Sequence, residues 1–185
     1  MIGNLPQKLK VGTQYYKIRS DYRDVLKILT AFSDPELSDE EKIYVCLFIL
    51  YEDFAALPQE LYEEAFKQAT SFIDNGMKSD GKKQMRVMDW EQDEPILFPA
   101  INKVAGFETR RVKYLHWWTF LGYYMEISDG VFSHIIGMRL KKAKGKKLEK
   151  SEREYWNANL AMCRLTEKLS EEDQQIKNQL NEMLG

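Results

Sequence analysis

Four carboxylates lie within six residues, at Asp89, Glu91, Asp93 and Glu94, and could in principle bind a metal ion or transfer a proton. Either chemistry would require them to converge on one point. Along a helix, residues two apart point about 200° away from each other, so Glu91 and Asp93 diverge. Acids in the first turn of a helix instead offset the positive end of its dipole. The pattern therefore favours a structural role for these acids.

The two histidines, His116 and His134, are the other candidates for chemistry. Neither has a cysteine nearby or a second histidine at the spacing of a metal site. No local motif completes a nucleophilic triad around either one. We therefore expect both to lie on a helix surface or at the edge of the core. We expect no catalytic residue, no metal, no cofactor and no enzymatic activity.

Two basic segments could bind phosphate. Residues 76–83, "GMKSDGKK", have the spacing of a nucleotide-binding loop, but Lys83 stands where magnesium needs a hydroxyl and a helix is expected where a strand should precede. Residues 139–150 carry seven basic residues around Gly145. We interpret that segment as a solvated loop, with an acidic protein partner as the next alternative. Because 27 basic residues oppose 29 acidic ones, the overall charge gives no argument for nucleic acid.

The stretch "YLHWWTF", residues 114–120, is the most aromatic of the chain and lies in a helix predicted over about 112–125. Adjacent helical residues point about 100° apart, so its two tryptophans cannot share one narrow stripe. We expect Trp118 to lie in the core. We predict that the second face, with Trp117, Phe120 and Tyr124, binds a partner, since large exposed aromatics are typical of interface hot spots.

The elements that must position these residues are mostly helical. Apolar residues make up 44% of the 185 positions, enough for a sizeable core. Residues 8–18 predict a β-hairpin that turns at Gly12-Thr13 and must rest on another element. Periodicity and capping signals then predict helices to the end of the chain. The fold class is mainly α, a compact bundle of about six to eight helices with a small N-terminal β-hairpin.

Local signals set the expected boundaries. Ser20 or Asp21 can cap a first helix, and Ser38 with Glu41 forms a capping box for a second. Pro58 is suited to the first turn of a third helix, which Gly76 ends. A second capping box, Asp89 with Gln92, precedes a segment in which Pro95 and Pro99 predict a kinked helix or two short ones, closed by Gly106. Further helices are expected over 128–140 and 151–169.

We expect one domain over 1–185. Its parts are the hairpin 8–18, a first helical half 19–76, a flexible linker 77–87, a second helical half 88–169 and an amphipathic tail 170–185. Cys46 and Cys163 are expected to be buried free thiols, which favours a reducing, intracellular setting. No apolar run reaches the roughly 20 residues that span a bilayer.

Residues 88–140 also resemble a known family. The "DWEQD" helix start, "LHWW-x-F", "F-x-x-I-I-G-x-R" and the Lys/Gly-rich segment that follows look like the signature of the bacteriophage "gene product fifteen" family of siphophage and prophage tail-region proteins. Pro95, Pro99 and the longer tail after Ser170 depart from that pattern. The hairpin and "LSDEEK" fit the first half of the family more loosely.

The resemblance implies a non-enzymatic tail-assembly chaperone that binds the tape-measure protein in the host bacterial cytoplasm and is absent from the finished virion. It implies no catalytic or cofactor-binding residues. Two alternatives stay open: a structural virion component, such as a tail or head–tail joining protein, and a nucleic-acid-binding accessory protein that uses residues 139–150. Self-association into a homo-oligomer also stays open.

Overall fold

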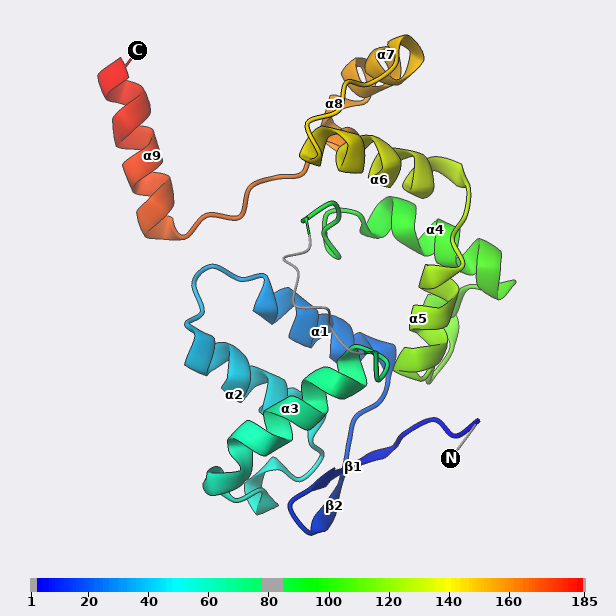
Figure 1. Ribbon diagram of the computed structural model, residues 1–185, viewed down its shortest axis with the longest axis vertical. Coiled ribbons are helices and arrows are strands. Elements are labelled where there is room, and N and C mark those ends of the chain that lie inside the picture. Colours follow the sequence, from blue (N-terminus) through cyan, green and yellow to red (C-terminus); the bar gives the residue numbers. More distant parts are fainter. Residues whose placement is uncertain (1–2, 78–84, 185) are drawn as a thin grey trace.

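A computed structural model describes residues 3–77 and 85–184 and shows a mainly α-helical protein with a two-stranded N-terminal hairpin (Figure 1), which confirms the fold class. The α-helices of the described residues are α1 (Tyr22–Phe32), α2 (Asp39–Leu50), α3 (Tyr62–Ile73), α4 (Glu94–Ala105), α5 (Trp117–Met125), α6 (Gly130–Ala143), α7 (Lys150–Ala158), α8 (Leu160–Cys163) and α9 (Glu171–Leu184). Short 3-10 helices are η1 (Phe54–Ala56), η2 (Gln59–Leu61) and η3 (Thr109–Arg111).

The hairpin pairs β1 (Lys8–Val11) with β2 (Gln14–Lys17) in antiparallel register, as expected. Gly12 turns the chain with a φ of 58°, a value that favours glycine. Its backbone N–H donates to the Glu64 carboxylate of α3 at 2.9 Å. Val11 is fully buried. The hairpin is thus held against α3, as a two-stranded sheet of marginal stability requires.

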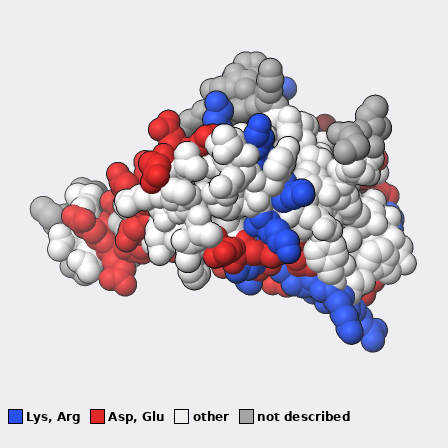
Figure 2. All heavy atoms as spheres, turned by 90° about the horizontal axis from the view of Figure 1, so that it is seen from below, with Lys and Arg blue, Asp and Glu red and all other residues white. Residues whose placement is uncertain are grey.

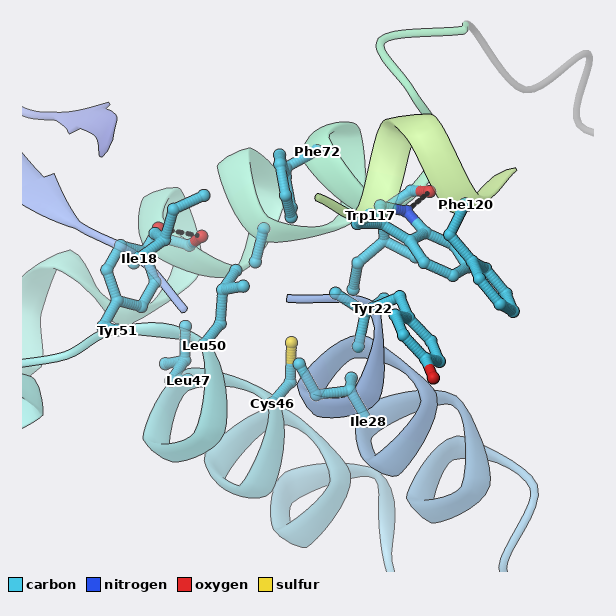
Figure 3. Packing of buried hydrophobic residues seen from close by; sticks show 14 of the residues in the cluster. Ile18, Tyr22, Ile28, Cys46, Leu47, Leu50, Tyr51, Phe72, Trp117 and Phe120 are labelled. Atoms are coloured by element: carbon cyan, nitrogen blue, oxygen red, sulfur yellow. Dashed lines mark hydrogen bonds between the residues drawn. The ribbon is translucent and has the colours of Figure 1, made fainter. Parts of the chain in front are cut away.

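Helices α1, α2 and α3 pack around one core, which continues to α4 and α5. Figure 3 shows part of this core, with Cys46 of α2 beside Ile28 of α1 and with Leu47 and Leu50 near Tyr51. The capping predictions for α1 and α2 are confirmed. The Asp21 side chain accepts from the backbone N–H of Arg23 at the start of α1. The Ser38 and Glu41 side chains form both bonds of the capping box of α2.

Helix α5 begins at Trp117, so the expected start at residue 112 is wrong. The preceding residues run extended beside the start of α1. The backbone N–H of Tyr22 donates to the Leu115 carbonyl at 3.0 Å, and the backbone N–H of Trp117 donates to the Ser20 carbonyl at 2.8 Å. A backbone that is paired with a neighbouring segment cannot also form helical hydrogen bonds.

The Asp89–Gln92 capping box is also corrected. Asp89 closes a turn, accepting from the backbone N–H groups of Glu91 and Gln92, and α4 begins only at Glu94. One helix runs from there to Ala105 with Pro99 inside it, so two short helices are not formed. Gly106 ends it in the left-handed conformation, with a φ of 78°, as expected.

The expected helix over 151–169 is replaced by α7 and the single turn α8, after which the chain is extended at Arg164. This split raises the number of described α-helices to nine. The side chain of Arg139, on α6, donates to the carbonyls of Met162 and Cys163. These bonds satisfy the last carbonyls of α8 and stop it there. The tail forms α9, which lies apart from the helices of the core (Figure 1).

Among the described residues, no helix is long and apolar enough to cross a membrane. Residues 78–84, the middle of the linker expected over 77–87 and most of the "GMKSDGKK" motif, lie outside the described part of the chain. Gly76 ends the α3 segment with a φ of 70°, as its position predicts.

Candidate functional site

Two of the three residues predicted to bind a partner lie in the core. Trp117 is 2% exposed, and its indole N–H donates to the Ile73 carbonyl of α3 at 2.8 Å. Phe120 is fully buried and stacks on Tyr22 of α1 with 4.3 Å between ring centroids (Figure 3). The prediction that these two side chains offer a surface to a partner is therefore wrong for this structure.

Tyr124, the third residue of that predicted face, is partly buried. Its hydroxyl donates to the Met88 sulfur at 3.1 Å, and its ring packs on Trp90 at 5.4 Å. Burial raises the pKa of this phenol. Tyr124 thus helps hold α5 against the segment that precedes α4. These contacts within the chain explain its position without a partner protein.

Trp117 is the fully buried tryptophan of the pair, whereas Trp118, which we expected in the core, packs against it only partly buried. Trp118 is partly exposed, although its indole N–H still donates to the Phe72 carbonyl at 2.8 Å. Neighbouring helical residues point about 100° apart, so α5 cannot turn both rings fully into the core. Both indole N–H groups donate to carbonyls at the end of α3, so the main role of the pair is to pack α5 against α3.

His116 is the N-cap of α5 and is 2% exposed. Its Nδ1 accepts from the backbone N–H of Trp118 at 3.0 Å, and its Nε2–H donates to the Pro6 carbonyl at 2.9 Å. Burial lowers the pKa of this imidazole and favours the neutral ring. His134 is exposed and meets Tyr155 edge-on. The described residues contain no group of three or more side chains suited to a metal.

Asp93 and Arg139 form a buried ion pair that the sequence did not reveal. The side chains are 1% and 4% exposed, and two hydrogen bonds of 2.7 and 2.9 Å join them. Arg139 also donates to the carbonyls of Val87, Met162 and Cys163. Its assignment to a solvated basic loop is wrong, because α6 extends to Ala143 and turns this side chain inward.

Asp89 belongs to the same interior. Burial raises the pKa of its carboxyl, but a hydrogen bond from the Gln92 backbone and bonds from Arg86 and Lys168 outweigh it and hold the pKa at about 2. Lys168 also bonds Glu91 at 2.9 Å. The acids of 89–93 therefore fasten the segment after α8 to the start of α4. They do not simply offset a helix dipole, and their partners are cations of the chain itself.

An exposed aromatic surface lies on α2 and η1, away from the Asp93–Arg139 ion pair. Tyr44 and Phe48 on α2 are 52% and 57% exposed. They stack on each other at 6.3 Å, and each meets Phe54 of η1 edge-on, at 5.2 and 5.9 Å. Phe54 in turn packs on Tyr62 at 5.3 Å. We call these four residues the α2 aromatic surface.

The α2 aromatic surface exists because α2 is apolar on more than one side. Cys46, Leu47 and Leu50 face the core, while Tyr44 and Phe48, four residues apart, share the outward face. A helix that is apolar around most of its circumference is buried in a core or shared with a partner. Clustered, solvent-exposed Tyr and Phe rings are typical of protein-binding surfaces.

This surface is also rigidly supported. The Arg19 guanidinium donates to the carbonyls of Phe48, Ile49 and Tyr51 at 2.8 to 3.2 Å, which closes the C-terminal end of α2. Cationic groups are favoured at that end of a helix. Two exposed rings on a helix capped at both ends are therefore presented in a fixed arrangement, which lowers the entropic cost of binding.

The segment that carries the rings is acidic, and we call its charged residues the acidic rim. Residues 39–64 contain eight acids and one lysine, a net charge of 1 − 8 = −7: Asp39, Glu40, Glu41, Glu52, Asp53, Glu60, Glu63 and Glu64 against Lys42. A partner for the α2 aromatic surface would therefore place apolar residues on the rings and Lys or Arg on the rim. The spacing of Tyr44 and Phe48 was the available sequence signal, since i and i+4 share a helix face distinct from that of Leu47 and Leu50.

Comparison with known proteins identifies the family. No curated protein and no solved structure matches the chain. A protein-family model described as "Bacteriophage Gp15 protein" matches residues 1–165, which include the hairpin, α1 to α8 and the α2 aromatic surface. This match points to a part in phage structure or morphogenesis. The chain belongs to the bacteriophage Gp15 protein family.

Proposed function

We propose that this protein is a non-enzymatic tail-assembly chaperone that binds the tape-measure protein in the host cytoplasm while the tail is built. The observation that carries the proposal is the α2 aromatic surface, whose rings at Tyr44 and Phe48 are more than half exposed. Membership of the Gp15 family and the resemblance of residues 88–140 to tail-region proteins support the phage context.

The geometry suits a helical client. An amphipathic helix places apolar residues at i, i+3, i+4 and i+7 along one face and can lay them on an apolar surface. Tyr44, Phe48 and Phe54 form such a surface, and the acidic rim favours a helix with Lys or Arg beside its apolar stripe. A long tape-measure helix presents many segments of this kind, and a chaperone would keep them from aggregating.

Co-purification with fragments of the tape-measure protein encoded by the same phage tests the function. We expect wild-type protein to retain at least one fragment and to keep it soluble. The variant Tyr44→Ser with Phe48→Ser should lose the fragment. Tyr15→Ser with Phe107→Ser is a matched control, because it removes one exposed Tyr and one exposed Phe elsewhere, 63% and 40% exposed. Failure of every fragment to bind wild-type protein would overturn the chaperone role.

The second candidate is a structural component of the virion, such as a tail or head–tail joining protein. The complementary charges of α9 and of the α6–α7 end, described below, favour it, because they would suit a protein that assembles with copies of itself. Mass spectrometry of purified virions separates the two functions. A chaperone is absent from finished particles, whereas a structural component is present at a fixed copy number.

A further inference from the structure

Helix α9 lies outside the matched residues 1–165 and has an uncovered apolar face. Ile176 and Leu180, four residues apart, are 48% and 52% exposed. The Ser170 hydroxyl accepts from the backbone N–H of Asp173 and caps the helix. An isolated helix of 14 residues is marginally stable in water, since most helical stability in proteins comes from packing. This helix therefore needs a surface to pack on.

The linker before α9 is fastened in place. The Thr166 backbone N–H donates to Gln92 at 2.8 Å, and its carbonyl accepts from Arg86 at 2.9 Å. Lys168 bonds both Asp89 and Glu91. These contacts hold α9 on the side of the molecule away from α7 (Figure 1).

The charge of α9 identifies a complementary surface. Residues 171–184 contain four acids and one lysine, a net charge of 1 − 4 = −3, with Glu171, Glu172 and Asp173 in the first turn. Figure 2 shows acidic side chains gathered on the side where α9 lies. The surface that α9 packs on should therefore be basic and should offer an apolar hollow for Ile176 and Leu180.

The end of the molecule formed by α6, α7 and the segment between them has both properties. A hollow of about 460 Å³ is lined by Lys142, Lys146, Lys147, Leu148, Arg153 and Trp156, which we call the basic end. The Lys142 ammonium lies 4.9 Å from the centre of the Trp156 ring. Leu148 and Trp156 are the apolar residues of this lining, and four of its other residues are cations.

We propose that α9 of one copy docks into the basic end of a second copy, which joins the chains head to tail. Ile176 and Leu180 fill the hollow over Leu148 and Trp156, and the acidic first turn of α9 faces Lys146, Lys147 and Arg153. The contact is heterologous, so each copy retains a free α9 at one end and a free basic end at the other, and assembly continues beyond a dimer. This contact is independent of the α2 aromatic surface and of any client.

The acidic rim argues against the alternative that α9 packs on the α2 aromatic surface of a second copy. Residues 39–64 carry a net charge of −7 and α9 carries −3, by the counts given above. Like charges across an interface oppose association. The basic end carries the charge opposite to that of α9.

Sedimentation velocity of the full chain tests the proposal with two variants. Ile176→Asp with Leu180→Asp disables α9 and keeps the basic end. Lys146→Glu with Lys147→Glu disables the basic end and keeps α9. All four side chains are exposed, so neither change should unfold the protein. We expect wild-type protein to associate with rising concentration, less so with added salt, and each variant alone to be monomeric.

Mixing the two variants provides the sharpest outcome. One intact α9 then meets one intact basic end, so a 1:1 heterodimer should form and should grow no further. Tyr44→Ser with Phe48→Ser should associate like wild type, which separates this contact from client binding. A monomeric wild type at all concentrations would overturn the proposal, as would a mixture that stays monomeric.

Two further outcomes would also overturn it. Association that survives Lys146→Glu with Lys147→Glu but not the α9 variant would mean that α9 pairs with itself or with another surface. Unchanged self-association, together with loss of salt-sensitive binding to single-stranded DNA in the Lys146→Glu and Lys147→Glu variant, would make the basic end a nucleic-acid site.

Discussion

The side chain of Arg139 is buried and paired with Asp93, although its sequence neighbours suggest an exposed basic segment. Arg139 opens the basic run 139–150, yet its guanidinium donates to Asp93 and to three backbone carbonyls inside the protein. Sequence alone could not assign it, because only the length of α6 and the position of the chain after α8 determine that it points inward. Its role is to join α4, α6 and α8.

Removal of this arginine should be costly. Arg139→Ala leaves the Asp93 carboxylate buried without its cation, and breaking one side of a buried ion pair costs about 3–5 kcal/mol. Urea denaturation followed by circular dichroism measures the free energy of unfolding. Arg153→Ala, at an exposed position, is the control and should change it by less than about 0.5 kcal/mol. Equal stability of the two variants would show that the ion pair does not hold the fold.

His116 should make stability depend on pH. Burial lowers the pKa of its imidazole in the folded protein, so the unfolded chain binds the proton more tightly. The stabilisation is complete above the ordinary pKa of about 6.5 and is lost as the pH falls through the folded-state value. Protonation also removes the acceptor that caps α5.

The variant His116→Asn checks this assignment, because asparagine can cap a helix but does not titrate. We expect the free energy of unfolding of wild type to fall as the pH is lowered from 7 toward 5, and the variant to fall less over the same range. Identical pH profiles of the two proteins would remove His116 as the source of the dependence.

At the scale of the elements, local signals were sufficient where a glycine turn or a capping side chain sets a boundary without a competing segment. The hairpin turn at Gly12, the cap at Asp21, the capping box of Ser38 and the end of α4 at Gly106 are all where the sequence predicts them. Boundaries failed where a distant segment competes for the backbone. The start of α5 is set by residues 20–22, and the end of α8 by Arg139.

The capping box of α2 allows a test at this scale, since the helix carries the α2 aromatic surface. Ser38→Ala removes the side chain that accepts from the Glu41 backbone and should lower the free energy of unfolding by about 1 kcal/mol. Thermal and urea unfolding measure the loss, and Ser38→Thr, which keeps the hydroxyl, should retain most of the stability. A Ser38→Ala protein as stable as wild type would contradict the role of the cap.

The same contrast applies to the candidate site. The sequence predicts an aromatic partner-binding face at Trp117, Phe120 and Tyr124, but two of these side chains are buried. Trp117 and Phe120 are buried because the backbone contact of residues 115–117 with α1 turns them inward. The exposed rings are Tyr44 and Phe48, which lie on the outward face of α2. Only the packing of α2 on α1 and α3 shows which of its apolar faces remains free.

For the whole molecule, charge is distributed unevenly along the chain although the totals nearly cancel, at 27 basic and 29 acidic residues. An acidic segment carries the α2 aromatic surface, a basic end lies at α6 and α7, and α9 is acidic again. Opposite charges on separate parts of one molecule favour ordered association over indiscriminate binding. We therefore propose two surfaces with different partners, a client at α2 and a second copy at α9.

Titration calorimetry of a tape-measure fragment into the protein tests the central proposal most directly. Truncation of one hot-spot residue costs about 2 kcal/mol or more and such costs are not additive, so Tyr44→Ser with Phe48→Ser should weaken binding by at least about 30-fold, the loss expected for one residue, while Tyr15→Ser with Phe107→Ser should leave the Kd nearly unchanged. Equal affinity of wild type and the Tyr44→Ser, Phe48→Ser variant, with both proteins folded, would contradict a client site on the α2 aromatic surface.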